Sequence, residues 1–270
     1  MRIWVHGGFA NGSGTGTPSY TPEAEAFFTA ASITDTTEKN AINQLVVDLQ
    51  SASVWNKMDI IYPYVGNTSG STSYNLKDTG SYQITWDLGT SGIDFNNGVN
   101  FSGSNNNYGR TGWIPSTTLT TAQDLSIGYG SNTLNNTVVD VEFGCFNNTA
   151  QALQVNVDNN ANSFATRFTS DASISGTTIA TGSMLLLKPS GSNTINFYQS
   201  GETVRTTSST NNSIPTYEFY LGGMNFNGSF YTPNQSSNRH TFFTIGEGLT
   251  PTEAADYITA FDTFQTTLSR

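Results

Sequence analysis

The sequence contains few of the side chains on which most enzymes and nucleic-acid-binding proteins rely. Its 270 residues include one cysteine and two histidines, and charged residues make up only 11% of the chain. The lone Cys145 excludes an internal disulfide framework. Ten basic residues against 20 acidic ones give a net charge of −10, which argues against nucleic acid or an anionic membrane surface as a partner.

Long hydrophobic runs are also missing. No apolar stretch approaches the roughly 20 residues needed to span a bilayer, and the first nine residues lack the apolar region of a signal peptide. We therefore expect synthesis in a reducing cytoplasm and a fold held together by packing. Gly, Asn, Ser and Thr are abundant, and these residues suit strands and the turns between them. This composition is typical of an extracellular or virion β protein.

Helix signals occur towards both ends of the chain. Thr21 and Pro22 are typical of a helix start, and residues 35–49 combine a capping-box pattern (Asp35 with Glu38) with apolar residues at helical spacing. A last helix is predicted over residues 250–269, where Thr250-Pro251-Thr252-Glu253 is a second capping box. Its apolar stripe must be buried, and the simplest partner is the N-terminal pair of helices.

Short apolar stretches separated by polar turns occupy the middle of the chain. Strands are predicted over residues 82–88, 125–129, 138–146, 153–157, 163–168, 173–180, 183–188, 194–198, 203–207, 217–221 and 241–245. About ten strands at this spacing are typical of a sandwich or jelly roll. The sequence therefore predicts a mainly β protein, an antiparallel β-sandwich with a small helical layer from the N- and C-terminal segments.

The chain divides at its N-terminal linker. Residues 1–20 end in a Gly/Ser/Thr-rich stretch and are interpreted as an arm and linker for assembly. Residues 21–270 are predicted to form one β-sandwich domain, with N-terminal helices in residues 21–62 and the C-terminal helix in residues 250–269.

Both ends of this domain resemble a known family. The helix over 35–49, the stretch from Trp55 to Gly66 and Asn75-Leu76-Lys77-Asp78 resemble the front of concanavalin A-like and LamG-like jelly-roll domains in tailed-phage structural proteins. The end is similar too, in Ile245-Gly246-Glu247-Gly248-Leu249-Thr250, Glu253 and residues 264–270. One departure is Ser269, where glycine is typical of the family.

The resemblance implies a location and partners. Such a protein would be a virion structural protein, made in the host cytoplasm and placed in a tail, baseplate, fibre or capsid appendage. It would assemble with copies of itself as a homo-oligomer or with other virion proteins, and it could take part in host attachment. The resemblance does not imply catalysis, and we expect no enzymatic activity.

A glycanase is the weakest alternative. Asp140 and Glu142 share one face of a predicted strand, as paired carboxylates in such enzymes do. The third acid of the concanavalin-like glycanase motif is missing, because position 145 is cysteine. A solvent-facing position on an amphipathic strand explains the pair equally well. His6 and His240 have no catalytic or zinc motif around them, so no catalytic residue is predicted.

Carbohydrate binding is the second hypothesis. Aromatic rings stack on sugar faces, and neighbouring amides bond to hydroxyl groups. Two stretches of the chain have this composition, and the candidates for binding a host surface glycan are Tyr108, Arg110, Trp113, Asn225, Phe226 and Tyr231.

The sequence predicts no cofactor and no well-defined metal site. Calcium could be held by Asn/Asp-rich loops, for which Asp94 and Asp158 are the weak candidates. Turns rich in these residues need no metal, so both interpretations stay open.

Overall fold

The computed structural model describes residues 19–89, 92–101, 106–121, 123–133, 139–148, 151–158, 163–168, 171–175, 181–210, 213–231, 233 and 235–270. The predicted arm, residues 1–20, therefore lies almost entirely outside the described residues. The described chain begins beside helix α1 (Pro22–Ala30), where the ring of Tyr20 packs edge-on against Phe28 with centroids 5.1 Å apart. Among the described residues, no helix is both long and apolar enough to cross a membrane.

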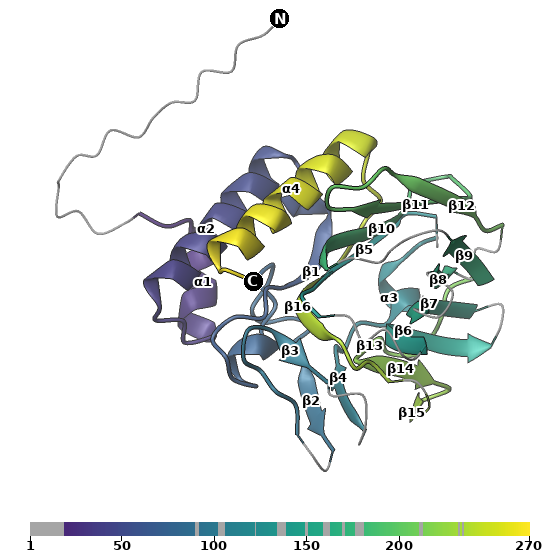
Figure 1. Ribbon diagram of the computed structural model, residues 1–270, viewed down its shortest axis with the longest axis horizontal. Helices are drawn as coiled ribbons and strands as arrows, with labels where there is room; N and C mark the ends of the chain where they lie inside the picture. The colour runs from purple at the N-terminus through teal and green to yellow at the C-terminus, as the bar shows by residue number, and fades with distance from the viewer. Residues whose placement is uncertain are drawn as a thin grey trace, which may run out of the picture.

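Two β-sheets form a sandwich, and helices cover one of them (Figure 1). Among the described residues sheet A consists, in spatial order, of β1 (Met58–Tyr62), β16 (Arg239–Gly246), β5 (Leu125–Ser131), β10 (Gly182–Lys188), β11 (Thr194–Gln199) and β12 (Arg205–Ser208), with β3 (Val99–Asn100) paired to β16. Sheet B consists of β2 (Thr85–Leu88), β4 (Asn107–Arg110), β13 (Tyr220–Leu221), β6 (Val139–Asn148), β7 (Gln151–Asp158), β8 (Ser163–Phe168) and β9 (Asp171–Ser175), with the hairpin of β14 (Gly223–Phe226) and β15 (Ser229–Tyr231) beside β6.

The predicted fold class is confirmed, with one difference in the sheets. The named strand pairs run antiparallel except for β14, which runs parallel to β6, so sheet B is mixed. The strand prediction over 82–88 begins too early, because Tyr82 has a φ of 54° and β2 starts only at Thr85. Residues 58–62, predicted within the helical segment, form β1 instead. Their β-branched and aromatic residues suit a strand.

Alternate residues of the strands fill the space between the sheets. The inward side chains are apolar and buried, and they include Phe143, Cys145, Leu153 and Val155 from sheet B and Met184, Leu186, Phe243 and Ile245 from sheet A. Burial raises the pKa of the Cys145 thiol, as expected for a core cysteine rather than a nucleophile.

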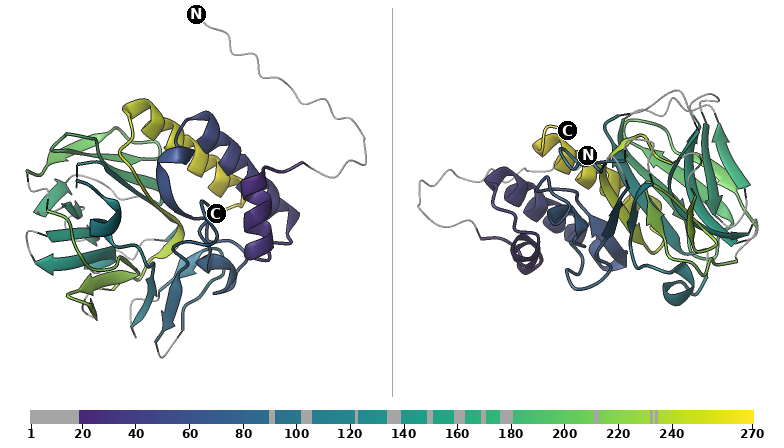
Figure 2. Two further views of the ribbon diagram at one scale, coloured as in Figure 1. Left: turned by 180° about the vertical axis from the view of Figure 1, so that it is seen from behind. Right: turned by 90° about the horizontal axis from the view of Figure 1, so that it is seen from below.

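Helices α1, α2 (Thr36–Ser51) and α4 (Pro251–Thr267) form a layer on the outer face of sheet A, on the side away from sheet B (Figure 2). The predicted partnership of the last helix with the N-terminal helices is confirmed. One buried cluster contains Tyr257, Phe261 and Phe264 of α4, Ile42, Leu45 and Leu49 of α2, and Leu185 and Leu187 of β10. The ring of Phe261 also stacks on Phe242 of β16 with centroids 4.1 Å apart.

The helix ends are capped by side chains, partly as predicted. At α4 the capping box is complete, because Thr250 N donates to Glu253 Oε2 at 2.7 Å and Glu253 N donates to Thr250 Oγ1 at 3.3 Å. At α2 the box is only half formed. Asp35 accepts the Glu38 amide at 2.9 Å, but the Glu38 carboxylate accepts a hydrogen bond from Gly66 N in the loop after β1 instead.

The two ends of the domain, on which the resemblance to phage proteins rests, contact each other directly. Glu247 N donates to Lys57 O at 2.8 Å, and Lys57 Nζ pairs with Glu253 Oε2 at 2.7 Å. Gly246 permits this approach, since a Cβ there would lie 2.4 Å from Lys57 O. The buried Asn75 amide bonds the backbone of β1 at 2.9 and 3.0 Å. The residues that carry the resemblance therefore close the fold.

Three short helical turns complete the described fold: η1 (Trp55–Lys57), η2 (Ser71–Ser73) and α3 (Pro115–Thr118). The chain ends in a Schellman turn, in which Ser269 N donates to Thr266 O and Arg270 N donates to Gln265 O, both at 3.0 Å. Ser269 has a φ of 56°, in the left-handed region that favours glycine. Glycine would adopt this conformation with less strain than serine does.

Candidate functional site

The outer face of sheet B carries rings from five strands. Tyr108, Tyr220 and Phe146 adjoin core-facing residues on β4, β13 and β6, so by alternation they point away from the core. Phe230 and Tyr231 are consecutive residues of β15, and their side chains therefore lie on opposite faces of the β14–β15 hairpin. Rings consequently gather on both sides of this hairpin, in two rows.

The first row is Tyr220, Tyr108 and Phe230. Tyr108 stacks on Phe230 with centroids 4.2 Å apart and planes at 8°, and its ring centroid lies 4.9 Å from that of Tyr220. Burial and then the Asp87 carboxylate raise the pKa of Tyr108 to about 12, so its hydroxyl stays protonated at neutral pH. This row presents an aromatic edge with two tyrosine hydroxyls near carboxylates, that of Tyr108 near Asp87 and that of Tyr220 near Glu218.

The second row is Phe146, Phe226 and Tyr231. Phe226 stacks on Phe146 with centroids 4.9 Å apart and planes at 9°, and it lies 5.6 Å from Tyr231. The side chains beneath it form a small apolar cluster separate from the core. Phe226 is nevertheless 38% exposed, which makes it one of the few large hydrophobic side chains on the described surface.

Amide groups lie on the same face of sheet B. Gln154 of β7 pairs with Gly144 of β6, beside Phe146, and its Nε2 donates to Asn156 Oδ1. Gln154 Oε1 is buried and has no hydrogen-bond partner among the described residues. The face thus combines stacked rings with an amide oxygen that can accept a hydrogen bond.

Arg110, the cationic side chain that the structure describes on this face, is already paired with a carboxylate. Arg110 Nε donates to Asp87 Oδ2 at 2.9 Å, and both side chains are partly exposed. The Asp87 and Glu218 carboxylates raise the pKa of Arg110, although burial alone would lower it. The local charge therefore does not favour an anionic ligand.

Four of the six predicted glycan-binding residues, Tyr108, Arg110, Phe226 and Tyr231, lie on this outer face, and the other two do not fit their predicted role. Trp113 is fully buried in the core, with its ring edge-on to Phe219 at 5.9 Å. Asn225 is 2% exposed, because its amide accepts a bond from Gly228 N and donates to Glu218 O. Both residues shape the fold and cannot stack on or bond to a ligand outside.

Three ring residues of the two rows, Tyr220, Phe146 and Phe230, were not predicted as site residues. Each lies within a predicted strand or an aromatic stretch of the sequence. That position was the signal from which sequence reasoning could have found it. Strand pairing over some 80 residues of sequence brings Phe146 beside Phe226, and no local pattern encodes that neighbour.

The paired carboxylates are buried rather than solvent-facing, which corrects the interpretation of an amphipathic strand. Asp140 is 1% exposed and Glu142 is fully buried. Glu142 Oε2 lies 2.5 Å from His240 Nε2 and 2.6 Å from Ser236 Oγ, and Ser237 N donates to Asp140 Oδ2 at 3.1 Å.

A serine, a histidine and a carboxylate meet here without forming a catalytic triad. Ser236 Oγ and Glu142 both contact His240 Nε2, whereas a triad uses the two ring nitrogens for different partners. His240 and Glu142 are 0% exposed, so a substrate has no access to them. The cluster connects sheet B to the segment before β16 and is structural.

Neither calcium candidate gains support. The Asp94 carboxylate pairs with Arg239 Nη2 at 2.6 Å and accepts bonds from Asn96, and a cation would have to displace this arginine. The Asp158 side chain lies outside the described residues. Within the described part of the chain no three acidic, histidine or cysteine side chains are grouped as metal ligands.

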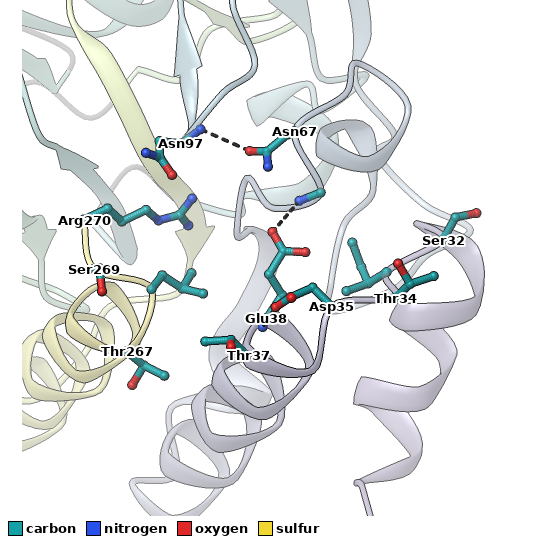
Figure 3. A pocket seen from close by; sticks show the side chains of 13 residues that line it. Ser32, Thr34, Asp35, Thr37, Glu38, Asn67, Asn97, Thr267, Ser269 and Arg270 are labelled. Atoms are coloured by element: carbon teal, nitrogen blue, oxygen red, sulfur yellow. Dashed lines mark hydrogen bonds between the residues drawn. The ribbon is translucent and has the colours of Figure 1, made fainter.

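A polar pocket of about 450 Å³ lies where the chain end meets the turn between α1 and α2 (Figure 3). Glu38 and Asn67 on its wall already accept the amides of Gly66 and Asn97, at 2.9 and 3.1 Å. The described residues that line the pocket include no aromatic ring. It therefore lacks the stacking surface that the outer face of sheet B offers.

Comparison with known proteins identifies structures with a similar fold, but it identifies no family. No family model and no curated protein matches the sequence. Among solved structures, the binding domain of botulinum neurotoxin serotype D matches with a TM-score of 0.50 and 10% identity, over 76% of this chain and 51% of that one. This likeness shows the β-sandwich fold and nothing about a ligand.

Weaker matches come from sialidases. A sialidase of Streptococcus pneumoniae matches with a TM-score of 0.39 and 9% identity over 49% of this chain, which spans 23% of that protein. The CBM40 module of a Ruminococcus gnavus sialidase matches with a TM-score of 0.40 and 14% identity, over 67% of this chain and all of the module. No phage protein is among these three, so the phage resemblance stays a prediction.

Proposed function

We propose that the protein is a carbohydrate-binding β-sandwich whose ligand lies on the outer face of sheet B, across the β14–β15 hairpin. One observation carries the proposal: the partly exposed Phe226 stands in a row of rings, and on the same sheet face lies Gln154 Oε1, which has no partner among the described residues. Rings supply the stacking surface for a sugar, and amides supply its hydrogen bonds.

The glycan is neutral. Asp87 already occupies the Arg110 guanidinium at 2.9 Å, and the chain carries a net charge of −10. An anionic polysaccharide would meet long-range repulsion, and Arg110, the cationic side chain that the structure describes on this face, is already paired with Asp87. A neutral polysaccharide avoids this cost.

Direct binding measurements with matched variants test the proposal. The full chain and its Phe226→Ala and Tyr231→Ala variants are compared on an array of neutral and acidic glycans, and affinity for the best neutral ligand is measured by calorimetry. Loss of one stacking ring should weaken binding about tenfold, since an aromatic contact of this kind contributes about 1 kcal/mol beyond its buried area. Val204→Ala is the control, because Val204 is 49% exposed and lies outside the outer face of sheet B.

Two results contradict the proposal. One is the absence of binding to any glycan on the array, and the other is unchanged affinity in both ring variants. Preferential binding to acidic glycans would be compatible with the proposed site, but it would contradict the proposal that the ligand is neutral.

We also propose that the protein binds carbohydrate without cleaving it, and that this binding attaches a virion to its host. The resemblance to tailed-phage proteins supports the virion location, and the burial of Asp140 and Glu142 supports the absence of glycanase chemistry. Antibody labelling of purified virions tests the location. Release of reducing sugar from a bound polysaccharide would refute the absence of catalysis.

A further inference from the structure

A second polar cavity, of about 340 Å³, lies between the C-terminal half of α4 and the ends of strands in sheet A. Its described lining includes Asn132, Thr181, Ser200, Thr241, Asp262 and Gln265. A single water molecule needs roughly 10–15 Å³ of such space. The cavity is therefore far larger than one bridging water requires.

An unsatisfied hydrogen-bond donor lines this cavity. Gln265 is 7% exposed, and its Nε2 has no partner among the described residues. The orientation of its amide follows from chemistry, because Gln265 Oε1 accepts Arg270 Nε at 2.9 Å and an arginine can only donate. The Nε2 group thus carries two hydrogens with no acceptor in place, which costs free energy unless something binds there.

An acceptor also lies in the cavity wall without a partner. Asn132 Oδ1 is buried and bonds nothing within the described chain. Across the cavity, the Asp262 carboxylate accepts the Ser200 hydroxyl at 2.6 Å. A ligand that satisfies the wall must both accept from Gln265 and donate to Asn132, as hydroxyl groups do.

The charges in the wall disfavour an anion. Four N–H groups of Arg270 bond Gln265 and the carbonyls of Tyr64, Pro63 and Thr241, so the guanidinium has little left for a ligand. The Asp262 carboxylate would repel a negative group. Burial lowers the pKa of Arg270 to about 10, and the residue still carries its charge at neutral pH.

We propose that this cavity binds a neutral polyol of monosaccharide size, whose hydroxyl oxygens accept hydrogen bonds from Gln265 Nε2 and whose hydroxyl groups donate to Asn132 Oδ1 and Asp262. The site is separate from the outer face of sheet B. It lies against α4, which packs on sheet A, and does not depend on the aromatic rows.

Titration of the ¹⁵N-labelled full chain tests the proposal. The probes are glucose, galactose and N-acetylglucosamine, with glucuronate as the anionic and glucosamine as the cationic comparator. The side-chain amide signals of Gln265 are assigned by their loss in Gln265→Met. At least one neutral sugar should shift them saturably, and glucuronate should bind at least about tenfold more weakly.

A variant at the mouth of the cavity separates binding from folding. Thr266 is exposed and lines the cavity, so Thr266→Trp should obstruct it and weaken binding at least about tenfold, while Thr29→Trp on α1 is the matched exposed control. Thermal unfolding confirms that each variant is folded. Phe226→Ala should leave this binding unchanged, so that failure here and failure of the outer-face proposal are distinguishable.

Three outcomes overturn the inference. The absence of any saturable shift with the neutral sugars means that the cavity holds water alone. Binding of glucosamine alone means an amine site at Asp262. Unchanged affinity in Thr266→Trp places the observed binding elsewhere.

Discussion

Replacing Glu142 by glutamine should destabilise the protein strongly while barely changing its shape. The fully buried carboxylate receives hydrogen bonds from His240 Nε2 at 2.5 Å, Ser236 Oγ at 2.6 Å and Asn238 Nδ2 at 2.6 Å. Glutamine turns one acceptor oxygen into a donor, so at least one of these three donors then faces another donor. Leaving a buried donor without its acceptor costs about 1–3 kcal/mol, and more where a charged group is involved.

We expect a decrease of about 3 kcal/mol in the free energy of unfolding for Glu142→Gln, and a fall in Tm of roughly 6–12 °C at this chain length. Urea unfolding followed by circular dichroism measures the first value, and calorimetry measures the second. Glu25→Gln is the control. Its side chain is exposed on α1, and such a change is expected to alter stability by less than about 0.5 kcal/mol.

The same pair of proteins gives a pH test. Burial raises the pKa of Glu142, but the hydrogen bond and attraction of His240, with the bonds from Ser236 and Asn238, outweigh it and hold the pKa below the ordinary 4.5. A lowered folded-state pKa contributes stability that is present above 4.5 and is lost as the pH falls through the folded value. The difference between wild type and Glu142→Gln should therefore shrink below about pH 4.5.

Two results would refute this reasoning. One is a loss below about 1 kcal/mol at neutral pH, which would mean that the cluster is open to water. The other is a difference that grows as the pH falls, which would reverse the sign of the pKa shift.

Three further predictions concern single residues. Ser269→Gly should stabilise the protein by about 0.5–1 kcal/mol, because Ser269 has a φ of 56° and glycine relieves this strain; urea unfolding measures it, and a loss of stability contradicts it. Cys145 should react with a thiol reagent only in denaturant, since burial raises its pKa, and rapid labelling of the folded protein would count against this. Gly246→Ala should cost at least about 1 kcal/mol in urea unfolding, because its Cβ would lie 2.4 Å from Lys57 O; a near-neutral effect would show that β1 can shift.

Local patterns predicted the helical layer well. The capping residues Thr250 and Glu253 and the apolar spacing of α4 depend on neighbours three or four positions away, so a single sequence contains them. The same holds for the apolar face of α2. The boundary at Tyr82 was missed, because a positive φ at a non-glycine residue depends on its surroundings.

The candidate binding face was only partly predictable. Tyr108, Phe226 and Tyr231 were identified from the aromatic and amide composition around them. The same composition also selected Trp113, which the structure buries completely. Whether a ring lies in the core or on the outer face depends on which sheet face its strand directs inward, and short strands with irregular alternation do not reveal this.

The β-rich class, the capped helices and the net charge of −10, which argues against a nucleic-acid partner, can all be inferred from the amino-acid sequence. Those properties follow from composition and from contacts between residues close in the chain. Three features emerge only from the fold: Glu142 and His240 form a buried pair, rings from β4, β6 and β13 gather with those on the two sides of the β14–β15 hairpin, and Gln265 lines a cavity with a donor that is unpaired among the described residues. Each of these depends on strand pairing or helix packing between distant segments, and the free energy that selects such a pairing comes from the whole core.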